Sequence, residues 1–292
     1  MKVMKINTKE IEKFWALEHL GIVDPPSVNG EEMIKNSLKR NDDGQFVASW
    51  PMKSGMQPGH NRDVAVMREK RLKLSAEQEM RYKEQIDSML RDNYLEEVQN
   101  LPNDLSNVTF LPHRPVFKET SATTKTRMVV DPSSSKKGEW PLNECMETGP
   151  TALPKVPGVL MRFRVGEVGV IADIEKAFLR ILLSEESRNR CCITWKGKVY
   201  RFTSVPFGVK ASPGVLQVVV QVLLNENIAQ FPEVAQALKR AMYVDDCIDS
   251  CDSAFEAESY LKSAKLIFES AKMSLHKTRI GGGPESKVLG IS

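Results

Sequence analysis

The sequence predicts an α+β fold in which helices cover one side of an antiparallel sheet. From about residue 101 onward, short β-like runs are separated by turns. Two helices with clear start signals, Ser212-Pro213 and Ser253, are interleaved with these runs. Strands and helices do not alternate with the regular βαβ period of a doubly wound sheet, so we expect antiparallel pairing.

Composition excludes several classes of protein. The chain has 292 residues, of which 41% are hydrophobic and 27% charged, and its net charge is +3. These values are close to the globular average and exclude a fibrous or wholly disordered chain. No stretch approaches the roughly 18 apolar residues of a membrane span, and charges come too early for a secretory signal. The five cysteines lack metal-ligand spacing, so we expect reduced thiols in an intracellular protein.

The first hundred residues are polar and predicted to be mostly helical. Helical spacing of apolar residues, or a capping pattern, predicts three helices, and turn residues bracket a loop and a short strand. These elements are the helix Asn7–Leu17, the loop Pro25–Gly30, the strand Gln45–Trp50, the helix Asn61–Leu74, and a helix opened by a capping box at Ser75–Gln78. Near residue 100 the sequence pattern changes from mostly helical to short β-like runs, so we divide the chain into residues 1–100 and 101–292.

The second part is predicted to contain strands interleaved with two helices. Apolar alternation and turn residues predict five strands, two of them joined in a hairpin across Lys196-Gly197. The strands are Arg114–Lys118, Thr126–Val130, Val168–Ile171, Cys191–Trp195 and Lys198–Phe202. The helices are Pro213–Asn225, with Ser212 as its expected cap, and one that a capping box opens at Ser253–Glu256.

Carboxylates follow two apolar strands. Asp173 comes after one such run, and Asp245-Asp246 comes after another. Adjacent acids point to opposite faces of a strand or straddle a turn, so only one of that pair should readily join Asp173. Clustered carboxylates are costly without a cation, and Mg²⁺ suits them. The alternative interpretation places Asp245-Asp246 in a solvent-exposed hairpin turn.

Six segments resemble, in order, the motifs of reverse transcriptases. They are Arg127–Asp131 with Leu142-Asn143, Asp173–Phe178, Ser204–Gln217, Tyr243–Asp246, Leu275–Lys277 and Val288–Gly290. Phe14–Glu18 and Leu111–His113 are further similar to the BEL/Pao class of long-terminal-repeat retrotransposon polyproteins. The resemblance implies a right-hand polymerase: fingers and an antiparallel palm sheet packed on helices in residues 101–292, preceded by a helical extension or linker in residues 1–100. Because the chain ends inside what resembles the primer grip, the thumb is expected to be missing.

The resemblance implies an RNA-directed DNA polymerase that adds deoxynucleotides to a primer 3′-hydroxyl by two-Mg²⁺ nucleotidyl transfer. Asp173 and Asp245 would bind the two ions, for which Mn²⁺ can substitute. Asp246 would be the supporting third acid, and the Ile174 carbonyl an extra ligand. Lys277 matches a position proposed as proton donor to the leaving pyrophosphate.

Substrate contacts are implied in the same way. Arg127 and Lys125 would contact the triphosphate, because cationic side chains grip phosphate. Both have the alternative interpretation of a solvated strand face. Phe178 stands where an aromatic ring lies under the sugar, which predicts selection against a 2′-hydroxyl; without the resemblance it would read as a core aromatic.

The remaining implied contacts concern the base pair and the primer end. Phe207 stands where gypsy-type elements also carry Phe. Gly208 allows close approach of the backbone to substrate, and Gln217 would reach the template–nucleotide pair. Tyr243 and Val244 belong to the catalytic box, with Val244 shaping the hairpin against the primer end.

Partners follow from the same resemblance. We expect a primed RNA or DNA template, deoxynucleoside triphosphates, no membrane, and other polyprotein parts (protease, RNase H, integrase) that this chain lacks. Six cationic against two acidic residues between Arg114 and Lys137 predict a template and triphosphate surface.

The alternative function is a catalytically silent, truncated or co-opted remnant that at most binds nucleic acid. A metal-dependent nuclease or cyclase is disfavoured by the Pro206–Gln217 segment. The compartment, a cytoplasmic particle or the nucleus, stays open.

Overall fold

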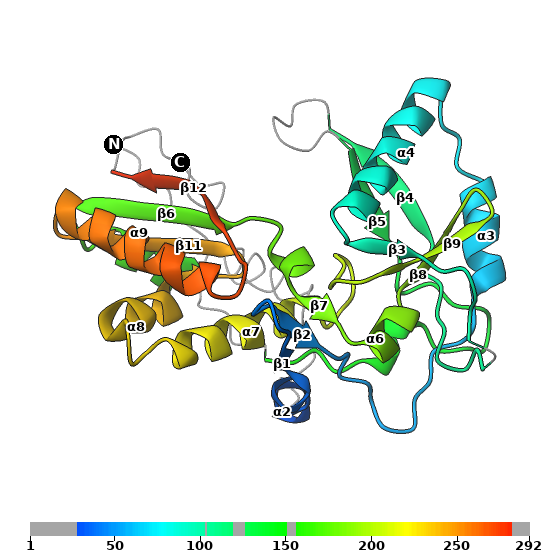
Figure 1. Cartoon of the computed structure of the whole chain (residues 1–292), viewed down its shortest axis with the longest axis horizontal. Coiled ribbons are helices and arrows are strands. Elements are labelled where there is room, and N and C mark those ends of the chain that lie inside the picture. Colours follow the sequence, from blue (N-terminus) through cyan, green and yellow to red (C-terminus); the bar gives the residue numbers. More distant parts are fainter. Residues whose placement is uncertain (1–27, 103, 119–125, 151–155, 282–292) are drawn as a thin grey trace, which may run out of the picture.

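The computed structural model describes residues 28–102, 104–118, 126–150 and 156–281, which form two lobes joined by a central layer (Figure 1). The first lobe contains a four-stranded sheet, and the second carries a β-hairpin beside a long helix. The predicted helix Asn7–Leu17 lies outside the described residues. Within these ranges, no helix is long and apolar enough to cross a membrane.

The four-stranded lobe is an antiparallel sheet in the strand order β10-β11-β6-β12. Its strands are β6 (Val168–Ile174), β10 (Met242–Tyr243), β11 (Asp246–Cys251) and β12 (Leu275–Ile280). Alternate residues of β6, such as Ala172 and Ile174, are buried in the main core. One face packs against α8 (Pro232–Ala241) and α9 (Ala254–Glu269), and α7 (Ser212–Glu226) packs against these two helices.

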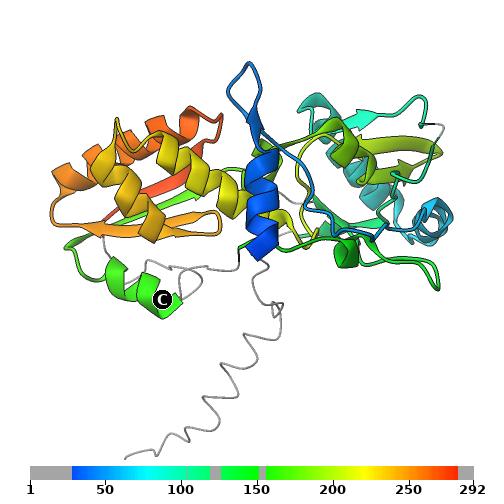
Figure 2. The ribbon, with the colours of Figure 1, turned by 90° about the horizontal axis from the view of Figure 1, so that it is seen from below.

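Helices were expected on one side of this sheet only, and that expectation is wrong. The helix α5 (Val156–Phe163) lies on the other face (Figure 2). Val159 of α5 and Ile248 of β11 form a small separate core against which Ile171 packs. The physical reason is that both faces of β6 and β11 carry apolar residues, so each needs cover from water.

The hairpin lobe contains two small sheets. The strands β4 (His113–Phe117) and β5 (Thr126–Val130) pair as a hairpin against α4 (Ala76–Arg91), while β3, β9 and β8 form a three-stranded sheet. The remaining elements are α3 (Arg62–Lys70), β3 (Leu95–Glu97), α6 (Glu185–Asn189), β8 (Cys192–Trp195) and β9 (Lys198–Phe202). The predicted capping box opens α4, with Ser75 and Gln78 satisfying each other's backbone N–H groups.

The central layer comes largely from the N-terminal part of the chain. It contains α2 (Val28–Ser37), β1 (Lys39–Arg40) and β2 (Phe46–Ala48), and β2 pairs in parallel with β7 (Leu182–Leu183). The predicted loop Pro25–Gly30 is corrected in part, because Asn29 and Gly30 lie inside α2. Ile34 is fully buried, so tertiary packing overrides the weak helix propensity of Asn and Gly.

Residues on both sides of position 100 share one core. Ile34, Phe46 and Tyr82 belong to the same buried cluster as Val170 and Leu223. The described residues 28–100 are therefore built into the fold and are not tethered to it as a separate unit. The division into residues 1–100 and 101–292 stays a proposal about the organisation of a polyprotein.

Two helix starts differ in detail from their predictions. Ser212 does not cap α7, because it is the helix's first residue and its hydroxyl donates to the Pro206 carbonyl at 2.8 Å. At α9, the Ser253 hydroxyl accepts from the Glu256 N–H as expected, but the Glu256 carboxylate accepts from the Asp252 N–H and does not reach back to Ser253.

Candidate active site

Two of the predicted catalytic acids are direct cross-strand partners. Asp173, near the end of β6, pairs in register with Asp246, the first residue of β11. Paired residues of an antiparallel ladder point to the same face of the sheet. Their strand neighbours Ala172 and Cys247 are fully buried in the helix-covered core. Asp173 and Asp246 therefore share the opposite face, where both are partly exposed.

The third acid is held by a turn. Val244 and Asp245 form the two-residue connection between β10 and β11, and Val244 has a φ of +56°. The Asp245 carbonyl accepts a hydrogen bond from the Ile174 N–H at 2.9 Å, which fixes Asp245 beside the end of β6. Of the two arrangements expected for adjacent acids, the structure has the one in which they straddle a turn, and Asp246 is the one in register with Asp173. Asp245 lies in the turn and only Asp246 in the ladder, so the two are not successive strand residues.

The electrostatics of these acids follow from crowding. Burial, followed by the charges of Asp245 and Asp173, raises the pKa of Asp246 to about 6. Burial, together with the charge of Asp173, also raises the pKa of Asp245. Lys277 opposes both shifts. The cluster is one that a cation stabilises.

Lys277 contacts the cluster directly. Its Nζ lies 2.8 Å from Oδ2 of Asp173, and this hydrogen bond raises the pKa of the Lys277 ammonium. Lys277 lies on β12, next to His276, which is the register partner of Asp173 on that side of the sheet. The structure thus places Lys277 among the acids, while its predicted role as a proton donor stays a prediction.

The donor set fits a divalent cation, although it is not a finished cage. Among the described residues, no three His, Cys, Asp or Glu side chains converge closely enough to hold a metal ion by themselves. Mg²⁺ is commonly held by one or two carboxylates together with substrate phosphates, so a complete protein cage is not required. Three carboxylates at one end of the sheet supply the hard oxygen ligands that such an ion prefers. The Ile174 carbonyl stays a predicted ligand.

Two aromatic rings lie beyond the acids. Phe178, in the 3₁₀ turn η2 (Ala177–Arg180), is only 6% exposed, whereas Phe207 is 54% exposed. Their centroids are 4.7 Å apart. The residue before η2, Lys176, has a φ of +52° and forms an ion pair with Asp92 at 3.2 Å. The sequence did not reveal this ion pair, because it joins residues 84 positions apart.

The loop that carries Phe207 is fastened to the hairpin lobe. Gly208 has a φ of +94°, and a Cβ there would lie 3.2 Å from the Val130 carbonyl oxygen of β5. Asn143 holds the same loop, since its Oδ1 accepts from the Lys210 N–H at 2.8 Å. Its amide nitrogen donates to Ser133 Oγ at 2.9 Å. Asn143 was noted in the sequence as part of a motif, but no local pattern indicates these contacts.

The other predicted substrate contacts are more scattered. Arg127 lies on the exposed face of β5, and Gln217 lies partly buried on α7. Tyr243 packs against the small core of Val159 and Ile248. Lys125 lies outside the described residues. The structure leaves the substrate roles of these residues, and that of Val244, as predictions.

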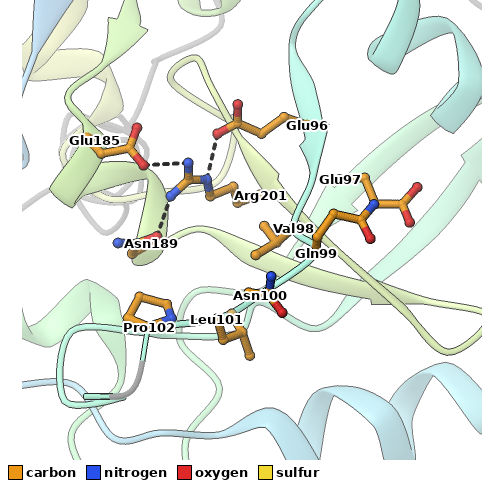
Figure 3. Close-up of a pocket in the computed structure, with 10 residues that line it drawn as sticks. All are labelled: Glu96, Glu97, Val98, Gln99, Asn100, Leu101, Pro102, Glu185, Asn189 and Arg201. Carbon is orange, nitrogen blue, oxygen red and sulfur yellow. Dashed lines mark hydrogen bonds and ion pairs between the residues drawn. The ribbon is translucent and has the colours of Figure 1, made fainter.

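A concave site of about 370 Å³ lies in the hairpin lobe, away from the aspartates (Figure 3). At its wall, Arg201 donates to Glu96 and Asn189, each at 2.6 Å, and pairs with Glu185 at 2.5 Å. Lys198 neutralises Glu97 at 2.9 Å. The charged groups of this pocket are therefore paired, either with one another or with Lys198, and none of the predicted site residues lines it.

Comparison with known proteins defines the class. Residues 118–292 match the family "Reverse transcriptase (RNA-dependent DNA polymerase)". Because this match covers more than half of the sequence, the chain belongs to the reverse transcriptase family. The four-stranded lobe is accordingly the palm, and the hairpin lobe is the fingers.

Individual relatives are similar but much longer. The retrovirus-related Pol polyprotein from transposon gypsy of Drosophila melanogaster is 25% identical over 131 residues, which are 44% of this chain and 12% of that polyprotein. The native protease-reverse transcriptase of Prototype Foamy Virus superposes with a TM-score of 0.59 at 19% identity, over 95% of this chain and 32% of the viral one. The foamy viral enzyme in complex with an RNA/DNA hybrid gives 0.58 at 18% identity, over 94% and 31%. At these identities, the two structures establish the fingers–palm fold alone.

Proposed function

We propose that this chain is the fingers–palm part of an RNA-directed DNA polymerase that extends a primer 3′-hydroxyl with deoxynucleotides. The observation that carries the proposal is the register pairing of Asp173 with Asp246, with Asp245 in the adjoining turn. This arrangement gathers three carboxylates at one end of the palm sheet in a member of the reverse transcriptase family.

The acids and Lys277 have separate roles in this proposal. Asp173 and Asp245 hold two Mg²⁺ ions, or Mn²⁺ in their place, with Asp246 as the supporting acid and the Ile174 carbonyl as a further ligand. When bound, the ions supply Lewis acidity toward the attacking hydroxyl and the leaving pyrophosphate. Lys277, whose Nζ is hydrogen-bonded to Asp173, delivers a proton to the leaving group.

The substrate lies between the acids and the fingers. Arg127 and Lys125 grip the triphosphate, and Phe178 excludes a 2′-hydroxyl with Phe207 packed against its ring. Gly208 lets the loop approach the nucleotide, and Gln217 reaches the template–nucleotide pair. The primer end rests against Tyr243 and Val244. The nearly buried ring of Phe178 and the exposed face of Phe207 support this division of roles.

The partners are a primed template and deoxynucleoside triphosphates. An RNA/DNA hybrid is bound to the foamy viral enzyme that shares this fold, and the exposed side chains Arg114, Lys118 and Arg127 give the fingers hairpin a positive face. Contacts of this kind read backbone and duplex shape more than sequence.

We further propose that the chain comes from an intracellular BEL/Pao-type element. The gypsy polyprotein supports a long-terminal-repeat retrotransposon origin. The segment Leu111–His113, one of two that resemble BEL/Pao polyproteins, has a structural role, because Leu111 is fully buried and His113 is bonded to Tyr82 and Thr194. Protease, RNase H and integrase would be further parts of such a polyprotein, and residues 1–100 its N-terminal extension, whose described part packs into the fingers and the central layer.

Mg²⁺-dependent primer extension tests the polymerase proposal. The purified chain is assayed on primed RNA and primed DNA templates beside Asp245→Asn, and Asp252→Asn serves as the matched control because it makes the same change at an exposed acid just after β11. We expect extension by the wild type and by the control, and a loss of about a thousandfold or more in Asp245→Asn. Failure of the wild type on both templates, or equal extension by Asp245→Asn, contradicts the proposal.

A further inference from the structure

Lys277 reaches the acid cluster through an irregularity in its own strand. The edge strand β12 pairs with β6 at His276↔Asp173 and again at Arg279↔Ile171. Three steps along β12 therefore match two steps along β6, which defines a β-bulge. Lys277 lies in this bulge with a φ of +48°, a conformation that a non-glycine residue adopts at a cost.

The bulge determines where the lysine points. In a regular strand, Lys277 would face away from its neighbour His276, and so away from the face that Asp173 occupies. With the bulge, the Lys277 Nζ lies 2.8 Å from Asp173 Oδ2. Asp173 retains 22% side-chain exposure and Lys277 64%, so the ammonium approaches the carboxylate from the solvent side.

The same ammonium also interacts electrostatically with the other two acids, Asp246 and Asp245, after its direct bond to Asp173. No second cationic side chain is bonded to Asp173, Asp245 or Asp246 within the described part of the chain. One lysine therefore supplies positive charge to three carboxylates and reduces the repulsion among them. A bound divalent cation has the same electrostatic effect.

We propose that Lys277 is a built-in counter-ion of the Asp173 carboxylate, which a divalent cation has to displace in order to bind there. This inference rests on the proposed function, because it takes Asp173 as a metal ligand. The two cations compete for Oδ2 of Asp173, so Lys277 holds the acids together at low metal concentration and lowers the apparent affinity of the site. The role is one of positioning and is separate from proton transfer.

Binding of Mn²⁺ alone, followed by calorimetry without nucleotide or nucleic acid, tests the competition. We expect Lys277→Met to bind Mn²⁺ about threefold to tenfold more tightly than the wild type, because a competing charge is removed. Lys277→Arg keeps the charge and should stay within about twofold of the wild type. Lys262→Met, at an exposed position of α9, is the matched control and should change nothing. Unchanged or weaker binding by Lys277→Met overturns the inference.

Thermal unfolding supplies a readout that needs neither activity nor tight binding. In EDTA, Lys277→Met should melt about 1–3 °C below Lys262→Met, because three acids lose their shared counter-charge. Added Mg²⁺ should raise its melting temperature by more than that of the wild type. Equal melting of the two variants in EDTA, or equal Mg²⁺ responses of Lys277→Met and the wild type, also overturns the inference.

Asp173→Asn separates this inference from the proposed function. If Asp173→Asn abolishes Mn²⁺ binding while Lys277→Met leaves it unchanged, only the counter-ion role fails. If Asp173→Asn binds Mn²⁺ as the wild type does, the metal assignment in the proposed function fails, and the competition fails with it. If the wild type binds no Mn²⁺, the competition fails, and primer extension alone decides the polymerase proposal.

Discussion

Phe178 and Phe207 pack edge to face, with ring centroids 4.7 Å apart and planes inclined at 65°. Phe178 is nearly buried, while Phe207 presents about half of its surface to solvent. The two rings come from separate segments, the turn after β6 and the loop before α7. The ion pair between Lys176 and Asp92 holds the start of the first segment. The position of the Phe178 ring is therefore fixed from two sides.

Shortening Phe178 should relax the choice of sugar. Phe178→Ala removes the ring proposed to clash with a 2′-hydroxyl, so we expect the ratio of kcat/KM for ribonucleotide over deoxynucleotide to rise about tenfold or more. Phe178→Tyr keeps the ring and is the control, with a ratio near that of the wild type. Single-nucleotide incorporation kinetics measure both. An unchanged ratio in Phe178→Ala, with deoxynucleotide incorporation retained, would remove Phe178 from sugar selection.

Local signals in the sequence were sufficient for several elements. The capping box at Ser75, the Lys196-Gly197 hairpin and the strand that leads to Asp173 are all present in the structure. Each depends on residues within a few positions of one another, so periodicity and turn chemistry determine them. The three acids could also be selected as candidates, because they follow apolar strands and resemble family motifs.

Long-range relationships could not be predicted in this way. Nothing local distinguishes Asp246 from Asp245, yet register pairs Asp246 with Asp173 and leaves Asp245 in the turn. The helix α2 forms around Gly30 because Ile34 is buried by distant parts of the chain. The bulge that directs Lys277 is likewise a property of pairing with β6. These features depend on tertiary packing and strand pairing between distant segments, which local patterns in a single sequence do not specify.

Gly208 and Gly197 offer a matched test of backbone contact. Both have positive φ, +94° and +79°, but a Cβ at Gly208 meets the Val130 carbonyl, whereas nothing lies within 4 Å at Gly197. Gly197→Ala should cost about 1 kcal/mol of unfolding free energy through its backbone conformation alone. Gly208→Ala should cost about 2 kcal/mol and raise KM for deoxynucleotides, because its loop shifts from β5. Urea unfolding and steady-state kinetics measure these effects. Equal losses of unfolding free energy in Gly197→Ala and Gly208→Ala, with an unchanged KM, would contradict the contact between Gly208 and β5.

The cap of α4 should be measurable as stability of the fingers. Ser75 Oγ accepts from the Gln78 N–H at 3.2 Å, so Ser75→Ala leaves that donor without its side-chain partner. We expect a loss of about 1 kcal/mol in the free energy of unfolding. Ser88→Ala, inside the same helix, is the control and should be neutral or slightly stabilising, since Ala favours helix interiors. Urea unfolding compares the two variants, and equal values would show that the cap contributes nothing.

His113 should make stability depend on pH. Burial lowers the pKa of His113 below its ordinary 6.5. Its Nε2 donates to the Thr194 carbonyl at 2.7 Å, which leaves Nδ1 to accept from the Tyr82 hydroxyl. As pH falls through about 6.5, His113 becomes protonated in the unfolded chain while it stays neutral in the folded chain. The free energy of unfolding therefore decreases as the pH falls from about 6.5 to the lower pKa that His113 has in the folded chain. The contribution is fully present above about pH 7.5.

His113→Gln cannot titrate at this position and tests the prediction by urea unfolding. Between pH 7.5 and 5.5, its free energy of unfolding should decrease less than that of the wild type. The same decrease in both proteins would show that His113 is not the titrating group.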